Sequence, residues 1–168
     1  MMKVMIRTDK LSKYYGKGGE IKAVDELDLE VCEGETFGLL GPNGAGKTTT
    51  VRLLNNIIKP TSGTATVNGH DILQEETEVK RVTGLLAESP GLYEKLSAYE
   101  FLEFIGALYD VPSDILPERI DDLLKLFGLY DRRDYLLEGY SRGMKQKILI
   151  AAALIHDPPI LFPLRRPQ

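Results

Sequence analysis

The residues best suited to chemistry lie in one glycine-rich stretch, Gly41–Thr48, which fits the pattern G-x-x-x-x-G-K-[ST] at every fixed position. The glycines allow the backbone to wind with its N–H groups pointing inward, where side chains would collide with phosphate oxygens. Lys47 is placed to reach the β- and γ-phosphates of a nucleotide, and the Thr48 hydroxyl to bind Mg²⁺. The residues expected to line this phosphate-binding loop are Gly41, Pro42, Asn43, Gly44, Ala45, Gly46, Lys47, Thr48 and Thr49.

The segments on either side of the loop fit this interpretation. Thr36–Leu40 is a short apolar stretch, predicted to form a strand that leads directly into the loop. A helix is expected from Lys47 to about Ile57, and its N-terminus would favour a bound anion. Further strands are predicted at Met5–Leu11, Ala23–Val31, Thr64–Val67, Val82–Leu86 and Ile160–Phe162, with a tight turn at Asn68-Gly69.

The second half of the chain is rich in helix signals. Ser97 and Glu100 have the spacing of a capping box, which predicts the start of a helix. Pro117 and Ser141 mark the starts of two more helices. Strands come first, then the helix after the loop, then a helix-rich insertion, then a return to the sheet. This order predicts an α/β fold, a P-loop NTPase core with a helical subdomain at about residues 88–139.

Composition and charge narrow the class of protein. The chain has 168 residues, a net charge of −4 and a pI near 5.3, so no basic surface indicates nucleic acid as a partner. Cys32 is the single cysteine, which excludes an internal disulfide and a cysteine-rich zinc site. We find no signal peptide, and the longest apolar stretch, Ile148–Ile155, is too short to span a bilayer. A cytoplasmic location is therefore expected.

Three further segments resemble the nucleotide-binding subunit of ATP-binding cassette (ABC) transporters. The first is Leu11–Gly16, upstream of the strand at Ala23, where this family places an aromatic residue that stacks on adenine. The resemblance assigns this role to Tyr15, because an aromatic face suits a flat purine. Its neighbour Tyr14 remains the alternative. The guanine-reading string Asn-Lys-x-Asp of GTPases does not occur, which favours ATP over GTP.

The second segment, 85–93, resembles the Q-loop of the family, the hinge between the ATP core and the helical subdomain. Glu88 stands where the family has glutamine. A carboxylate can still offer an oxygen to Mg²⁺, so the resemblance makes Glu88 a candidate metal ligand beside Thr48. The additional negative charge near the phosphates is expected to change affinity or coupling.

The third segment, 140–147, resembles the family's signature sequence at the start of a helix. Ser141 and Gly143 would bind the γ-phosphate of ATP held by a partner subunit, so the resemblance implies a homodimer or heterodimer. It also implies a separate membrane-spanning permease and a peripheral position on the inner face of the membrane. The amino-acid sequences of the second and third segments resemble those of the family's exporter branch, which includes drug-resistance and ABC-2-type systems.

The resemblance ends after the strand Ile160–Phe162. The family next supplies an aspartate that binds Mg²⁺ and a catalytic glutamate, whereas Leu164 and Arg165 stand at those positions here. With both carboxylates missing, we expect nucleotide binding to survive and ATP hydrolysis to be nearly lost. A reading-frame change or a truncation would explain the ending. The alternatives to a transporter subunit are a catalytically inactive nucleotide-binding module and a non-functional fragment.

Overall fold

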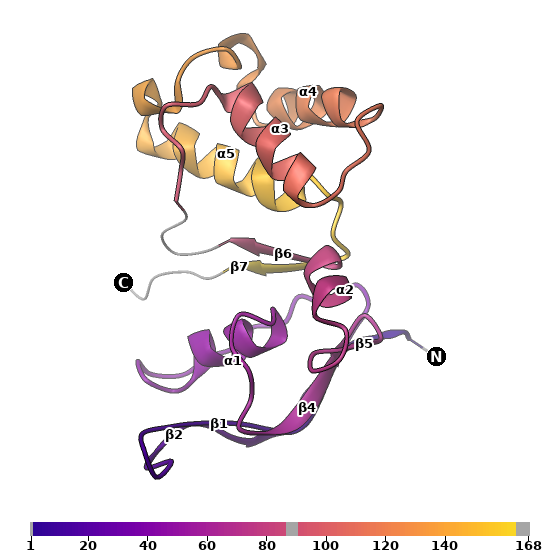
Figure 1. Ribbon diagram of the computed structural model, residues 1–168, viewed down its shortest axis with the longest axis vertical. Coiled ribbons are helices and arrows are strands. Elements are labelled where there is room, and N and C mark those ends of the chain that lie inside the picture. The colour runs from indigo at the N-terminus through magenta and orange to yellow at the C-terminus, as the bar shows by residue number, and fades with distance from the viewer. Residues whose placement is uncertain (1, 87–90, 164–168) are drawn as a thin grey trace. The chain divides into compact units, whose positions relative to one another are not determined.

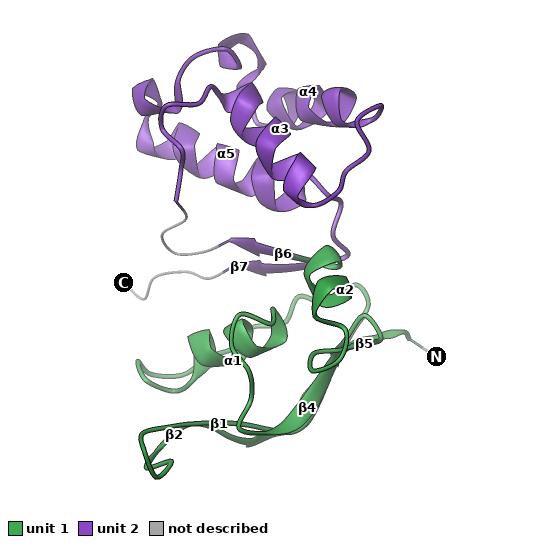
Figure 2. Cartoon of the chain, in the orientation of Figure 1, with its two compact units in different colours: residues 1–83, 164–168 green, residues 84–163 purple. Residues whose placement is uncertain are grey.

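The computed structural model describes residues 2–86 and 91–163. Glu88, Leu164 and Arg165 therefore lie outside the described residues. The chain divides into two compact units: unit 1 is Met1–Thr83 with Leu164–Gln168, and unit 2 is Gly84–Pro163 (Figure 2). The predicted subdomain boundary at about 88–139 stays a prediction.

Unit 1 is built on an antiparallel sheet around one long strand, β1 (Figure 1). Along the sheet the order is β2-β1-β4-β5, and β3 also pairs with β1. Strand β1 thus has partners along both of its edges, which take up its backbone N–H and C=O groups. The strands are β1 Val4–Tyr15, β2 Ile21–Leu27, β3 Glu30–Cys32, β4 Ser62–Val67 and β5 His70–Asp71.

The single strand predicted at Ala23–Val31 is wrong: this segment forms β2 and β3 with a break between them. The cause is Thr8 on β1, a buried residue whose hydroxyl takes the place of a backbone group in bonding to the backbone at Leu27 and Leu29. Its Oγ1 donates to the Leu27 carbonyl oxygen at 2.7 Å and accepts from the Leu29 N–H at 2.8 Å. The alternation of apolar residues continues across the break, so the sequence pattern did not reveal it.

The strand predicted at Thr36–Leu40 is also wrong, because these residues form neither helix nor strand. Phe37 is 50% exposed and Leu40 is 95% exposed. A short apolar stretch becomes a strand only where a neighbouring strand takes up its N–H and C=O groups. Both edges of β1 are already paired with β2, β3 and β4 in the described sheet, so this segment has no place beside it.

Helix α1, Lys47–Leu54, starts where predicted and ends three residues before Ile57. The helix stops because Asn56 adopts a left-handed conformation, with φ of 55°. Its side-chain amide donates to the Ile72 carbonyl oxygen at 2.8 Å, which holds the buried asparagine in that conformation. A long-range contact, and not the later Lys59-Pro60 pair, therefore sets the end of this helix.

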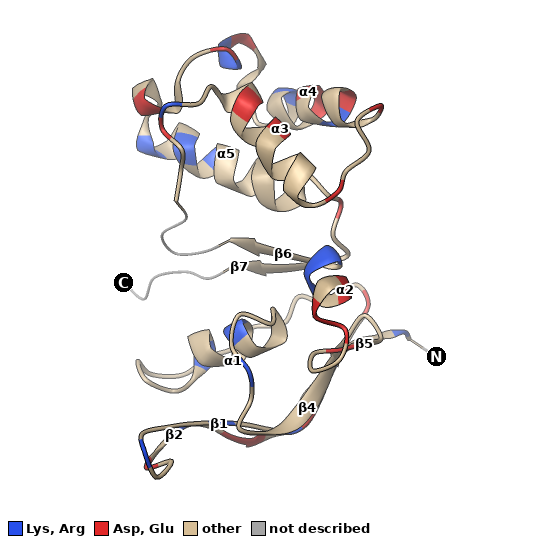
Figure 3. Cartoon of the chain, viewed as in Figure 1, with Lys and Arg blue, Asp and Glu red and all other residues tan. Residues whose placement is uncertain are grey.

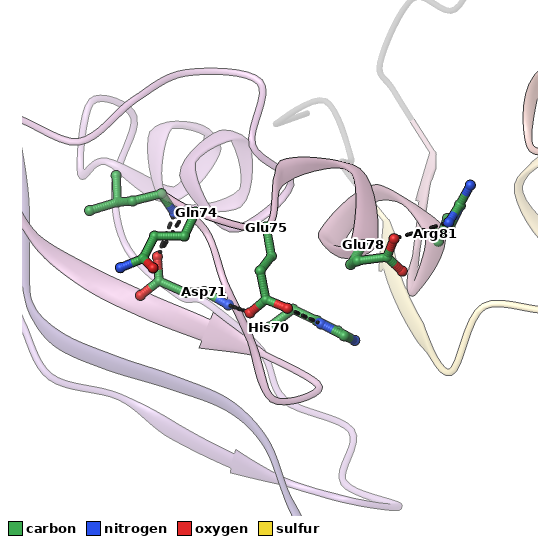
Figure 4. Close-up of polar contacts among 7 residues, drawn as sticks. His70, Asp71, Gln74, Glu75, Glu78 and Arg81 are labelled. Carbon is green, nitrogen blue, oxygen red and sulfur yellow. Dashed lines mark hydrogen bonds and ion pairs between the residues drawn. The ribbon is translucent and has the colours of Figure 1, made fainter.

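The predicted turn at Asn68-Gly69 is confirmed, with positive φ at both residues between β4 and β5. It is followed by helix α2, Glu76–Arg81, which was not predicted. Figure 4 shows the turn that leads into this helix: Asp71 accepts from the N–H of Gln74, and Glu75 accepts from the N–H of Asp71 at 3.0 Å. Acidic residues in its first turn and basic residues in its last complement the helix dipole, a signal that the sequence did contain.

The described part of unit 2 contains three α-helices and two short strands. The strands β6 Thr83–Leu86 and β7 Ile160–Pro163 pair with each other. The helices are α3 Ala98–Leu108, α4 Leu116–Leu126 and α5 Arg142–Leu154, with 3₁₀ turns at Tyr130–Arg132 and Leu137–Gly139. They share one apolar core, formed by Ala98, Phe101, Leu102, Leu116, Ile120, Leu124, Leu129, Leu137, Tyr140, Ile148, Ala151, Ala152 and Ile155.

The predicted helix starts in unit 2 are confirmed. Ser97 and Glu100 form both bonds of a capping box: the Ser97 hydroxyl accepts from the Glu100 N–H, and the Glu100 carboxylate accepts from the Ser97 N–H. The donated backbone N–H holds the pKa of Glu100 below its usual value. Pro117 lies in the first turn of α4, and Ser141 is the N-cap of α5. No helix in the described ranges is long and apolar enough to cross a membrane.

The core of unit 2 yields a matched pair of substitutions on one helix. Leu124 is fully buried on α4, whereas Leu126 on the same helix is 72% exposed. Leu124→Ala removes buried methyl groups and leaves a cavity, which destabilises a protein by about 2–5 kcal/mol. We expect Leu126→Ala to change stability by less than about 0.5 kcal/mol. Urea denaturation followed by circular dichroism measures both, and equal losses would contradict this packing.

Candidate nucleotide-binding site

The glycine-rich loop lies exposed at the start of α1. Gly44 and Gly46 have positive φ values, 86° and 78°, and the Ala45 N–H donates to the Pro42 carbonyl oxygen at 3.2 Å to close a turn. The first turn of α1 contains no acidic residue. Its N-terminal N–H groups and the loop backbone are therefore open to an anion, and no fixed negative charge opposes one.

Gly46 fixes the position of this loop on the sheet. A Cβ atom here would overlap the carbonyl oxygen of Ala23 in β2 and would lie 3.3 Å from the Val24 Cγ2. The Gly46 carbonyl oxygen also accepts the first backbone bond of α1, from the Thr50 N–H at 2.8 Å. Only glycine allows the start of α1 to approach the backbone of β2 this closely.

Lys47 turns back across the loop. Its Nζ donates to the carbonyl oxygens of Gly41 and Pro42, both at 2.6 Å. An ammonium group has three donors, so at least one remains for a ligand after these two bonds. The lysine thus holds the loop closed on itself and carries its positive charge where phosphate oxygens would bind.

The threonines that follow have different surroundings. Thr50 is buried, and its hydroxyl donates to the Gly46 carbonyl oxygen at 3.0 Å, so this hydroxyl bonds the backbone at the start of α1. Thr48 and Thr49 are half-buried at the loop surface. No cluster of His, Cys, Asp or Glu that could hold a metal exists among the described residues, and Glu88 lies outside them.

The two candidate tyrosines face different surroundings at the end of β1. The Tyr14 hydroxyl donates to the Asp25 carboxylate, and the Lys22 ammonium lies 5.3 Å from the centre of its ring. The Tyr14 hydroxyl, and then Lys22, hold the pKa of Asp25 below its usual value. Tyr15 is 41% exposed. Tyr14 is thus engaged within the hairpin, whereas the ring of Tyr15 is open to a ligand.

Ser141 and Gly143 lie exposed at the N-terminus of α5 in unit 2. The Ser141 hydroxyl accepts from the Met144 N–H at 3.3 Å. Figure 3 shows Lys and Arg along α5, and its first turn has no acidic residue. The charge of one of these basic residues, Lys145, is paired with Glu94 at 2.6 Å.

The loop and Tyr15 both belong to unit 1, whereas Ser141 and Gly143 belong to unit 2. Two contacts were missed by reasoning from the sequence. One is the pairing of Glu94 with Lys145, which joins segments 51 residues apart. The other is Lys13, whose ammonium lies over the ring of Tyr15. The contact of Lys13 with Tyr15 could have been predicted from the sequence, because residues two apart on a strand share a face.

The close approach at Gly46 predicts unequal effects of two glycine substitutions in the loop. Gly44→Ala meets no atom within 4 Å and pays only the strain of a left-handed alanine, about 1–2 kcal/mol. Gly46→Ala carries the same strain and also collides with the Ala23 carbonyl, so we expect about 1–3 kcal/mol more. Denaturation by urea compares the two variants, and an equal loss of stability would disprove the contact.

Comparisons with known proteins agree with this geometry. The family model for ABC transporters matches residues 24–163. The ABC transporter ATP-binding protein NatA of Bacillus subtilis is 41% identical over 156 residues, which are 92% of this chain and 63% of NatA. The daunorubicin resistance ATP-binding protein DrrA3 of Streptomyces coeruleorubidus is 40% identical, over 96% of this chain and 50% of DrrA3.

A solved structure supports the fold. The cbiO1 protein of Clostridium perfringens, described as part of the ABC transporter complex cbiONQ, superposes with a TM-score of 0.81 at 25% identity, covering 96% of this chain and 65% of cbiO1. This likeness confirms the predicted P-loop NTPase fold. The chain spans about half to two thirds of the length of these relatives. Because the family model covers most of its residues, the chain belongs to the ABC transporter family.

Proposed function

We propose that this chain binds Mg-ATP as the nucleotide-binding part of an ABC transporter. The observation that carries the proposal is the loop Gly41–Thr48, seated on β2 through Gly46 with the Lys47 ammonium at its centre. The loop offers backbone N–H groups, one cation and a helix N-terminus without acidic residues. This combination suits a polyphosphate better than any uncharged ligand.

Each part of the nucleotide has a proposed partner in unit 1. Backbone N–H groups among residues 43–49 hold the phosphate oxygens, and Lys47 contacts the β- and γ-phosphates. The Thr48 hydroxyl binds Mg²⁺, which is held mainly by the phosphates. Tyr15 stacks on adenine, a role supported by its exposed ring and by the engagement of Tyr14 with Asp25.

The proposed partners are a separate membrane-spanning permease and a second ATP-binding chain, on the inner face of the membrane. The relatives support the first partner through their names as ATP-binding proteins for transport and resistance. The exposed N-terminus of α5 supports the second, because its first turn carries no acidic residue that would repel a phosphate from another chain. The helices of unit 2 would form the helical subdomain of this nucleotide-binding part.

Binding of Mg-ATP predicts a rise in melting temperature that depends on Lys47. At a hundredfold excess over Kd, a ligand that binds only the folded state stabilises it by about 2.7 kcal/mol, which is roughly 5–10 °C here. We expect Lys47→Ala to abolish the shift. Lys80→Ala, which removes an exposed lysine on α2, is the control and should keep it. Absence of any shift in the wild type at millimolar Mg-ATP would refute the proposal.

Dimerisation through α5 predicts opposite effects of one substitution on folding and on assembly. A Cβ at Gly143 meets nothing within 4 Å, so Gly143→Glu fits without a clash. We expect a more stable helix, by about 0.5–1 kcal/mol from replacing glycine and a few tenths from the dipole. The same carboxylate should repel the partner's phosphate and prevent ATP-dependent dimers.

Light scattering on a sizing column, with and without Mg-ATP, measures the assembly. Gly143→Ala is the matched control, because it changes the backbone in the same way and adds no charge. ATP-dependent dimers of Gly143→Glu equal to those of the wild type would exclude α5 from the interface.

A further inference from the structure

Lys13 contacts the ring of Tyr15 through its ammonium group. Its ammonium is 5.3 Å from the centre of that ring, within the range of a cation–π contact. The same Nζ donates to the Lys59 carbonyl oxygen at 2.7 Å. The lysine is therefore held at two points and covers one side of the tyrosine ring.

The carbonyl that anchors Lys13 belongs to a segment that is itself tied to β1. The Thr61 N–H donates to the Ser12 carbonyl oxygen at 2.8 Å, and the Tyr14 N–H donates to the Thr61 hydroxyl at 3.0 Å. These bonds and the Lys13 bond clamp the end of β1 to the segment that follows α1. The carbonyl that accepts from the Lys13 ammonium is thus itself in a segment fixed to β1.

The register of the hairpin separates the two tyrosines. Tyr14 pairs directly with Lys22, whose ammonium lies over the Tyr14 ring. Lys13 and Tyr15 are two residues apart on β1 and share the opposite face. Each tyrosine ring is therefore contacted by a different lysine: Lys22 lies over Tyr14, and Lys13 lies over Tyr15.

We propose that Lys13 is a positioning residue that fixes the ring of Tyr15 so that its uncovered face receives the adenine base. The inference rests on the proposed binding of Mg-ATP and adds a second residue to base recognition. With one face of the ring covered by the ammonium, a purine can stack only on the other face. Fixing the ring before binding also reduces the entropy that stacking must overcome.

The first test separates the base from the phosphates. Calorimetry measures the affinity of Mg-ATP and of Mg-tripolyphosphate, which has no base, for the wild type and for Lys13→Met. A cation–π contact of about 0.5–2 kcal/mol corresponds to a roughly 2- to 30-fold weaker binding of ATP when it is lost. We expect that loss for ATP and unchanged binding of tripolyphosphate. Lys13→Arg should restore ATP binding, because it keeps the cation and a donor for Lys59.

Two controls make the outcome decisive. Lys17→Met removes the same charge from the neighbouring loop and should leave both affinities unchanged. If Lys13→Met does not fold, Lys13→Gln replaces it, since an amide can still donate to the Lys59 carbonyl. Equal losses for both ligands, or no loss for ATP, would overturn the role of Lys13. A wild type that binds neither ligand would instead refute the proposed function.

A spectroscopic readout isolates the ring itself, because the chain contains no tryptophan. In Tyr15→Trp, a stacked adenine should quench the fluorescence of the single indole, and in Tyr14→Trp it should not. Adding Lys13→Met to Tyr15→Trp should reduce the quenching at saturating ATP, because the ring is no longer fixed. Full quenching in the double variant would show that Lys13 does not position the ring.

Discussion

The absence of a side chain at Gly46 is the constraint on which the candidate site depends. Because no Cβ intervenes, the start of α1 rests directly on the backbone of β2 at Ala23. Strand β2 in turn pairs with β1, and Ile21 lies opposite Tyr15. The phosphate-binding loop therefore rests on the hairpin that carries the adenine-binding candidate. Strand register fixes Tyr15 relative to the strand on which the loop rests.

Both lysines of the site are held by backbone carbonyl groups. Lys47 donates to Gly41 and Pro42, and Lys13 donates to Lys59. A carbonyl oxygen attracts an ammonium without neutralising its charge, as a carboxylate would. Each cation is thus placed in advance and still available to an anion or an aromatic ring. Lys22, by contrast, is paired with Asp25 at 2.9 Å, so its charge is already balanced within the hairpin.

Local signals in the sequence predicted the parts of the fold that local contacts stabilise. The capping box at Ser97 and the turn at Asn68-Gly69 are formed by residues a few positions apart, and the phosphate-binding loop is a contiguous motif. The errors lie where distant residues decide: Thr8 divides the strand at 23–31, and Ile72 fixes the end of α1 through Asn56. Lys13 was missed for the same reason, because its value depends on a carbonyl 46 residues away.

The helices differ in whether their first turn carries an acidic residue, and this difference agrees with the proposed anionic ligand. Helices α2, α3 and α4 carry glutamate in the first turn, the usual complement to the helix dipole. Helices α1 and α5 carry none, and they are the two that begin at the glycine-rich loop and at Ser141. A glutamate would stabilise either helix and would compete with phosphate for the same N–H groups. The sequence therefore omits a stabilising residue at the two helix starts where an anionic ligand would take its place.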